Sequence, residues 1–164
     1  MKNKLDNFLL HFAIFFTNWL PDNVIFLRFR GWLCSFFLKG TCKNLRLGRN
    51  LTFYNSHKIF IGNDVYIAYG NWFCAGDEIV IGDEVMFGPL SIIVSTNHTK
   101  NEESYRYGSV KNKRIIINKG SWIGGNCNIL SGTEIGRGTV ISAGSTTFNK
   151  IPDNIKFIQN KIIN

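Results

Sequence analysis

Apolar residues recur every six positions along the C-terminal half of the chain. The aliphatic members of this column are Ile117, Ile123, Ile129, Ile135 and Ile141. A small residue follows each of them four positions later, namely Ser121, Cys127, Thr133, Thr139 and Ser145. A period of six is neither the two of a flat strand nor the 3.6 of a helix. The pattern therefore predicts a coil of short segments that turn at regular corners, with the aliphatic side chains stacked inside.

The same column continues upstream in three segments separated by slips of two residues. These segments hold Leu47, Phe53 and Ile59, then Ile61, Ile67, Phe73 and Ile79, then Ile81, Phe87 and Ile93. The slips predict bulged corners. Residues 94–114 break the period with a polar, charged stretch and are expected to form an excursion loop. Loops of this length are uncommon in a compact repeat and often carry function, so we expect catalytic residues there.

The first 40 residues follow a helical period instead. Apolar residues spaced by three and four predict one helix over residues 5–20, ended by Pro21, and a second over 25–37, ended by Gly40. The apolar face of the first helix carries Leu5, Phe8, Leu9, Phe12, Phe15, Phe16, Trp19 and Leu20. Such aromatic stripes usually pack against a core, and contact with a membrane surface is the alternative.

The distribution of charge along the chain supports the membrane alternative. The net charge is +8, and residues 1–60 hold nine Lys/Arg against two Asp. A basic, aromatic segment suits an anionic bilayer surface, and no nucleic-acid-binding motif accompanies it. The apolar stretch before Pro21 is too short to span a bilayer and lacks a signal-peptide cleavage site. We expect a cytoplasmic protein, with peripheral contact at the inner membrane surface left open.

The four cysteines at 34, 42, 74 and 127 show neither zinc-site pairs nor a disulfide framework. They are expected to be free thiols in a reducing compartment.

Several motifs together resemble the hexapeptide-repeat acyltransferases, in particular the maltose, galactoside and capsular-polysaccharide O-acetyltransferases. The resemblance covers about residues 45–155. It rests on IGNDVYI, IGDEVMFGP, STNH, KGSWIGGNCNILSGTEIGRGTVISAGS and IPDN. It implies a mainly β fold: a left-handed parallel β-helix over 45–155, two helices within 1–44 and a tail over 156–164. It also implies a homotrimer with active sites between subunits, acetyl-CoA as acyl donor, a sugar or polysaccharide acceptor and no metal.

Within the excursion loop, His98 matches the histidine that these enzymes use as general base. The chemistry agrees, because an alcohol attacks a thioester poorly until a base removes its proton. A surface histidine with ordinary hydrogen bonds is the alternative.

The resemblance also assigns binding residues. Asn71 lies close to the position of an acceptor-binding asparagine, although it also occupies a corner of the coil and could be a turn residue. Trp122 is expected to contact substrate. The pantetheine groove is expected to involve Gly124, Gly125, Ser142, Ala143, Gly144 and Lys150. The repeat itself requires small residues at its turns, and Lys150 is displaced by one position from the family's phosphate-facing lysine.

Three rival functions remain. A zinc carbonic anhydrase would need three clustered histidines, whereas this chain has only His11, His57 and His98, the first of them on a helix. A non-catalytic assembly module would use the repeat as scaffold alone. An acetyltransferase for an antibiotic, serine or a sugar amine would keep the chemistry and change the acceptor.

Overall fold

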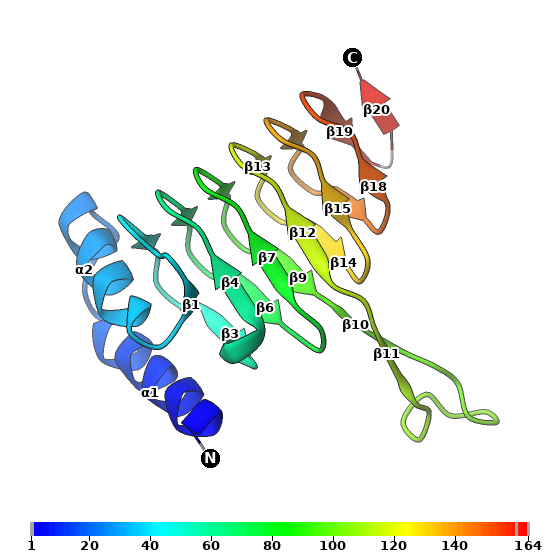
Figure 1. Cartoon of the computed structure of the whole chain (residues 1–164), viewed down its shortest axis with the longest axis horizontal. Helices are drawn as coiled ribbons and strands as arrows, with labels where there is room; N and C mark the ends of the chain where they lie inside the picture. The colour runs from blue at the N-terminus through cyan, green and yellow to red at the C-terminus, as the bar shows by residue number, and fades with distance from the viewer. Residues whose placement is uncertain (1, 160, 164) are drawn as a thin grey trace.

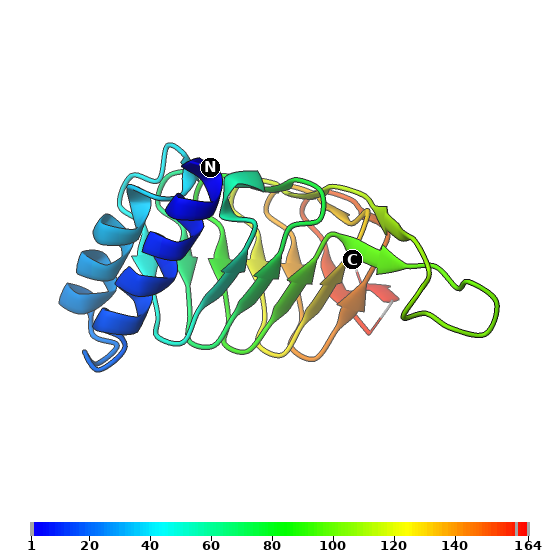
Figure 2. The same cartoon turned by 90° about the horizontal axis from the view of Figure 1, so that it is seen from below.

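A computed structural model describes residues 2–159 and 161–163 of the chain (Figure 1). Two helices, α1 (Lys2–Thr17) and α2 (Val24–Ser35), lie side by side at one end of a β-solenoid. The strands of the solenoid then stack along one axis toward the C-terminal end (Figures 1 and 2). This confirms the predicted fold class, which is a mainly β parallel coil preceded by two helices.

Three sheets form the walls of the solenoid, and the chain visits them in turn. The first comprises β1 (Lys39–Gly40), β4 (Ile59–Ile61), β7 (Ile79–Ile81), β12 (Ile115–Ile117), β15 (Glu134–Ile135) and β18 (Lys150–Ile151). The second comprises β2 (Arg46–Leu47), β5 (Tyr66–Ile67), β8 (Met86–Phe87), β13 (Trp122–Ile123), β16 (Val140–Ile141), β19 (Lys156–Ile158) and β20 (Lys161–Ile163). The third comprises β3 (Thr52–Tyr54), β6 (Trp72–Cys74), β9 (Ile92–Val94), β14 (Asn128–Leu130) and β17 (Thr146–Thr147). We call them the first, second and third sheets below.

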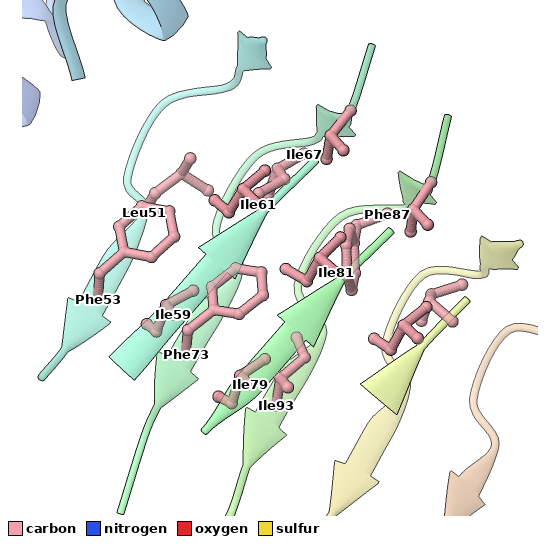
Figure 3. Close-up of a cluster of buried hydrophobic side chains, with 14 of the residues drawn as sticks. Leu51, Phe53, Ile59, Ile61, Ile67, Phe73, Ile79, Ile81, Phe87 and Ile93 are labelled. Atoms are coloured by element: carbon pink, nitrogen blue, oxygen red, sulfur yellow. The ribbon is translucent and has the colours of Figure 1, made fainter. Parts of the chain in front are cut away.

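The predicted aliphatic column lies inside the coil. Every member from Leu47 to Ile141 is buried, and equivalent side chains of successive coils stack on one another (Figure 3). The rings of Phe53 and Phe73, for example, are stacked with their centroids 5.0 Å apart. The narrow interior is therefore filled by one or two apolar side chains from each wall of each coil.

The two-residue slips in the column are not bulged corners, as the sequence suggested. Ile59 and Ile61 both belong to β4, and Ile79 and Ile81 both belong to β7. Because side chains alternate across a strand, two residues separated by one position face the same way. Both ends of these three-residue strands therefore point into the core, and the coils are longer without any break in the ladder.

Small polar side chains tie the corners of neighbouring coils together. Ser121 Oγ donates a hydrogen bond to the Gly136 carbonyl oxygen at 2.7 Å, and Thr139 Oγ1 donates one to the Pro152 carbonyl oxygen at 2.6 Å. Both residues are buried. A small hydroxyl at the corner thus satisfies a carbonyl of the next coil that would otherwise be buried without a partner.

The solenoid extends beyond both of the predicted boundaries. At its start, β1 pairs with β4, so that Gly40 lies opposite Ile61 rather than ending a helix. Gly40 has a φ of +97°, and a Cβ there would overlap the Ile61 backbone, so an inward aliphatic cannot mark this position. At the other end, β19 pairs with β16 and buries Phe157. The predicted tail therefore begins within a coil; its residues 160 and 164 lie outside the described residues.

Arg30 fastens the two helices to the solenoid. Its fully buried guanidinium donates hydrogen bonds to the carbonyl oxygens of Thr17, Leu20 and Leu47, at 3.0, 3.1 and 2.6 Å. It also lies 3.1 Å from the Asp22 carboxylate. Burial lowers the pKa of Arg30 from its ordinary value, and Asp22 opposes that shift. One cation thereby joins the end of α1, the interhelical turn and β2.

The aromatic face of α1 points away from the solenoid, contrary to the core-packing interpretation. The buried face of α1 is formed by Leu10, Ala13, Ile14 and Thr17. The exposed face consists of Leu5, Phe8, Phe12, Phe15 and Phe16, with Trp19 just beyond the helix. The core-packing interpretation was wrong because α1 is apolar on both faces, and the more aromatic face is not the one that packs against the solenoid. Within the described residues, neither helix is long and apolar enough to cross a membrane.

The expected excursion is a β-hairpin rather than an irregular loop. β10 (Thr96–His98) pairs antiparallel with β11 (Val110–Asn112). The hairpin leaves the solenoid between β9 of the third sheet and β12 of the first, and it projects from the body (Figures 1 and 2). It therefore starts at a corner of the coil, where an insertion does not interrupt the stacking of the strands.

Candidate functional site

His98 ends the outgoing strand of the projecting hairpin. It is exposed and lies opposite Val110 in the antiparallel ladder. The Asn97 side chain accepts a hydrogen bond from the His98 backbone N–H at 3.0 Å, and the described part of the chain provides no partner for the imidazole. The ring is therefore free to meet a ligand, while its backbone is held in a regular strand.

A polar pocket of about 390 Å³ lies at the base of this hairpin. Its lining is formed by Thr96, Asn97, Lys113, Leu130, Ser131 and Phe148. The Ser131 hydroxyl accepts a hydrogen bond from the Lys113 N–H at 3.0 Å and joins the hairpin to the coil. Lys113, Ser131 and Phe148 were not predicted as site residues, because only the fold brings the residues after the hairpin beside those before it.

A second cavity collects most of the predicted cofactor residues. It has a volume of about 220 Å³ on the second sheet, and its lining is formed by Trp122, Gly124, Gly125, Val140, Ile141, Ser142, Ala143 and Lys156. We call it the second-sheet groove. Trp122 stands beside it with 49% of its surface exposed. Gly144 is not among the lining residues.

The coil itself explains the glycines of the groove. A Cβ on Gly124 would lie 2.5 Å from the Ala143 backbone nitrogen, so close stacking requires glycine there. Gly144 has a φ of +74°, which favours glycine for conformational reasons. Ser142 differs, because its buried Oγ has no hydrogen-bond partner among the described residues. Buried polar atoms are seldom left in that condition, so Ser142 is the residue here that packing does not explain.

Two lysines are candidates for the family's phosphate-facing lysine. Lys150 lies in β18 of the first sheet, away from the groove lining, and its Nζ is 3.2 Å from a Glu134 carboxylate oxygen. Lys156 lies in β19, pairs with Val140 and lines the groove. Lys156 was not predicted as a site residue, because residues 156–164 were expected to form a tail.

Asn71 occupies a corner of the coil and is fully buried. Its side-chain nitrogen donates to the carbonyl oxygens of Ala68 and Gly88 at 2.8 and 2.9 Å, and its side-chain oxygen accepts from the Ser91 N–H at 3.1 Å. Of the two roles that the sequence left open, this geometry favours the turn residue over acceptor contact.

Covalent catalysis by a thiol has no support in the site. All four cysteines are free, and burial raises the pKa of Cys34 to about 12 and that of Cys42 to about 11. Burial also raises the pKa of Cys127, which lies under the second-sheet groove. A protonated thiol is a poor nucleophile. Across the described residues, no group of three His, Cys, Asp or Glu side chains could hold a metal ion.

Comparison with known proteins matches residues 114–149 to the family model described as bacterial transferase hexapeptide (six repeats). These residues of the chain are therefore similar to the hexapeptide repeats of that family. It is 29% identical over 102 residues to a galactoside O-acetyltransferase of Lactococcus lactis, a match that covers 62% of this chain and 49% of that protein. The chain thus spans about half the length of the curated relatives it matches. The resemblance to hexapeptide-repeat acyltransferases is confirmed.

Solved structures share the fold of this protein. One is a galactoside acetyltransferase in complex with coenzyme A, with a TM-score of 0.78 at 23% identity, covering 98% of this chain and 80% of that chain. Another is a hexapeptide-repeat acetyltransferase of Vibrio cholerae complexed with acetyl-coenzyme A, with a TM-score of 0.76 at 21% identity, covering 98% and 87%. The similarity extends over the helices as well as the coil.

Proposed function

We propose that this protein transfers an acetyl group from acetyl-CoA to a hydroxyl of a sugar-like acceptor. The observation that carries the proposal is the second-sheet groove, where Trp122, Gly124, Gly125, Ser142 and Ala143 line one cavity. These positions are the ones that the family resemblance assigned to donor and substrate. The narrow, small-residue wall suits a thin pantetheine arm.

In the proposed reaction, His98 is the general base. The imidazole takes the proton from the acceptor hydroxyl as the oxygen of that hydroxyl attacks the thioester carbonyl carbon. The C–S bond then breaks, and the departing CoA thiolate takes the proton from the imidazolium to become the free thiol. No covalent enzyme intermediate is needed, which agrees with the buried, protonated cysteines.

The polar pocket at the hairpin base supports a polyhydroxylated acceptor. Thr96, Asn97 and Ser131 offer hydroxyl and amide groups there, Lys113 adds a charge, and Phe148 adds an aromatic face. A sugar presents the matching mixture of hydroxyl groups and an apolar ring face. A surface polysaccharide precursor is the acceptor class that we propose; an antibiotic, serine or sugar amine remains the alternative.

The catalytic unit is proposed to need more than one copy of the chain. The hairpin with His98 leaves the corner between the third and first sheets, whereas the groove is on the second sheet. In a three-walled coil that corner is opposite the second wall, so one copy does not bring His98 to its own groove. This arrangement supports the homotrimer that the resemblance implies, with each hairpin serving a neighbouring groove.

The proposed reaction can be tested by following thiol release from acetyl-CoA. Purified full-length chain would be incubated with nucleotide sugars, lipid-linked sugars and polysaccharide fragments, and acetylated product would be identified by mass spectrometry. Acceptor-dependent thiol release is the expected result. A protein that neither binds acetyl-CoA nor releases thiol with any acceptor would instead be a non-catalytic assembly module.

A comparison of two lysine variants separates the candidate phosphate contacts. Lys156→Ala should raise the KM for acetyl-CoA about tenfold with little change in kcat, because a cation at the groove edge contributes mainly to donor binding. Lys150→Ala is the matched control, since it removes an exposed lysine of the first sheet. An increase in KM with Lys150→Ala alone would return the role to the residue that the sequence suggested.

A further inference from the structure

The helical end of the molecule exposes an apolar surface that the proposed acetyl transfer does not use. On α2, the residues that face outward are Val24, Ile25, Arg28, Phe29, Trp32 and, at the helix end, Phe36. The opposite face is buried against the solenoid through Leu27, Arg30, Gly31 and Cys34. We call these residues and the exposed face of α1 together the end surface. Both helices lie at the same end of the solenoid (Figure 2).

The aromatic rings of the end surface are organised rather than scattered. On α1, the ring centroids of Phe12 and Phe16 lie 4.4 Å apart, and those of Phe15 and Phe16 lie 5.4 Å apart. On α2, Trp32 packs edge-on against Phe36 with centroids 5.2 Å apart. Contiguous exposed apolar patches are uncommon on soluble proteins, and they mark contacts with another protein or with a membrane.

Basic side chains border this surface. Arg28 lies on the exposed face of α2, one turn before Trp32. Arg28, Trp32 and Lys43 line one pocket of about 410 Å³ between α2 and the first coil. Neither Arg28 nor Lys43 forms an ion pair within residues 3–159. By contrast, Asp22, one of the two acidic residues in the first 60, is engaged by Arg30 and Arg49.

We propose that the end surface docks the protein on an anionic lipid bilayer. The aromatic side chains would enter the boundary between headgroups and acyl chains, and Arg28 and Lys43 would face lipid phosphates. The surface lies at the far end of the coil from β20, so docking leaves the hairpin and the groove open. A second copy fits less well, because a symmetric contact would bring the same uncompensated cations against each other. The inference does not depend on the proposed acetyl transfer.

The test is flotation of the full chain with vesicles of phosphatidylcholine alone or with about 30% phosphatidylglycerol. We expect binding to the anionic vesicles that weakens in about 0.5 M salt. Trp19→Ser and Trp32→Ser should each lower the partition coefficient about tenfold or more, because each removes a large apolar group from the boundary. Arg28→Gln and Lys43→Gln should each lower it about fivefold on anionic vesicles only.

A matched control is Tyr107→Ser on the hairpin, since Tyr107 is 79% exposed and Trp19 is 78% exposed. Circular dichroism and gel filtration should show that all variants keep the parent's fold. Quenching of the parent's tryptophan fluorescence by brominated lipid gives a second measurement that needs no variant. Equal partition into neutral and anionic vesicles, or equal losses for Trp19→Ser and Tyr107→Ser, would overturn the proposal. The proposal would also be overturned if the parent protein failed to float and Trp19→Ser changed the oligomeric state. The end surface would then be a contact between copies.

Discussion

Replacing His98 by alanine is expected to lower kcat by about 10²-fold to 10⁴-fold, the usual contribution of a positioned proton transfer. The KM for acetyl-CoA should hardly change, because the groove that supports donor binding lies on another wall of the coil. The thermal midpoint should also stay near that of the parent, since His98 is exposed on the hairpin. Initial rates with saturating acetyl-CoA and the acceptor found in the screen provide the measurement.

The matched control is His57→Ala. His57 lies in the short helix η1 (Ser56–Lys58), two coils before the hairpin along the solenoid, and its removal should leave kcat unchanged. If His98→Ala retained more than about a tenth of kcat, the base would have to be another group or the direct attack would have to be abandoned.

Mixing two inactive variants would test whether the hairpin serves a neighbouring copy. His98→Ala keeps an intact groove, whereas Ala143→Trp fills the groove and keeps the histidine. If the two parts come from different copies, co-assembled variants recover part of the activity that neither has alone. No recovery, with mixed oligomers demonstrated, would place both parts on one copy.

Replacing Ile129 by aspartate is expected to cost about 3 kcal/mol or more in the free energy of unfolding. Ile129 is 0% exposed, and it lies between Ile93 and Thr147 of the neighbouring coils. A carboxylate there has no cation or water to replace its lost hydration, and the narrow coil leaves no room for it to turn outward. Urea unfolding followed by circular dichroism would measure the loss.

Ile92→Asp provides the control on the outer face of the same sheet. Ile92 is 41% exposed and pairs with Asn128, the neighbour of Ile129. Its replacement should cost less than about 1 kcal/mol, because the carboxylate remains in water. Similar losses for Ile92→Asp and Ile129→Asp would mean that the inward register of the column is wrong.

The interior of the coil could be predicted because its periodicity is local. Ile117 to Ile141 recur at a fixed interval, and every one is buried. The corner residues were equally visible, since Ser121 and Thr139 repeat with the same interval as the aliphatics. Breaks in the pattern were harder to interpret: Ile59 and Ile61 looked like a slip between corners but are the two inward positions of a single strand.

The candidate site was predicted less completely, because it joins residues that are distant along the chain. His98 was found on the only long interruption of the repeat, and the small residues of the groove lay in recognisable motifs. Lys156 was missed because the predicted coil ended at residue 155, before the buried Phe157, and Asn71 was ambiguous until its three hydrogen bonds were known.

By itself, the sequence determined that the chain forms a coil with an apolar column inside, since a repeating side-chain pattern has only one way to bury that column. It also determined that two helices precede the coil. Only the tertiary structure decided which face of α1 is buried, because that helix is apolar on both sides and the choice depends on fit against β3 and α2. The same holds for the placement of His98 and the groove on opposite sides of the coil, which follows from where the hairpin leaves the corner.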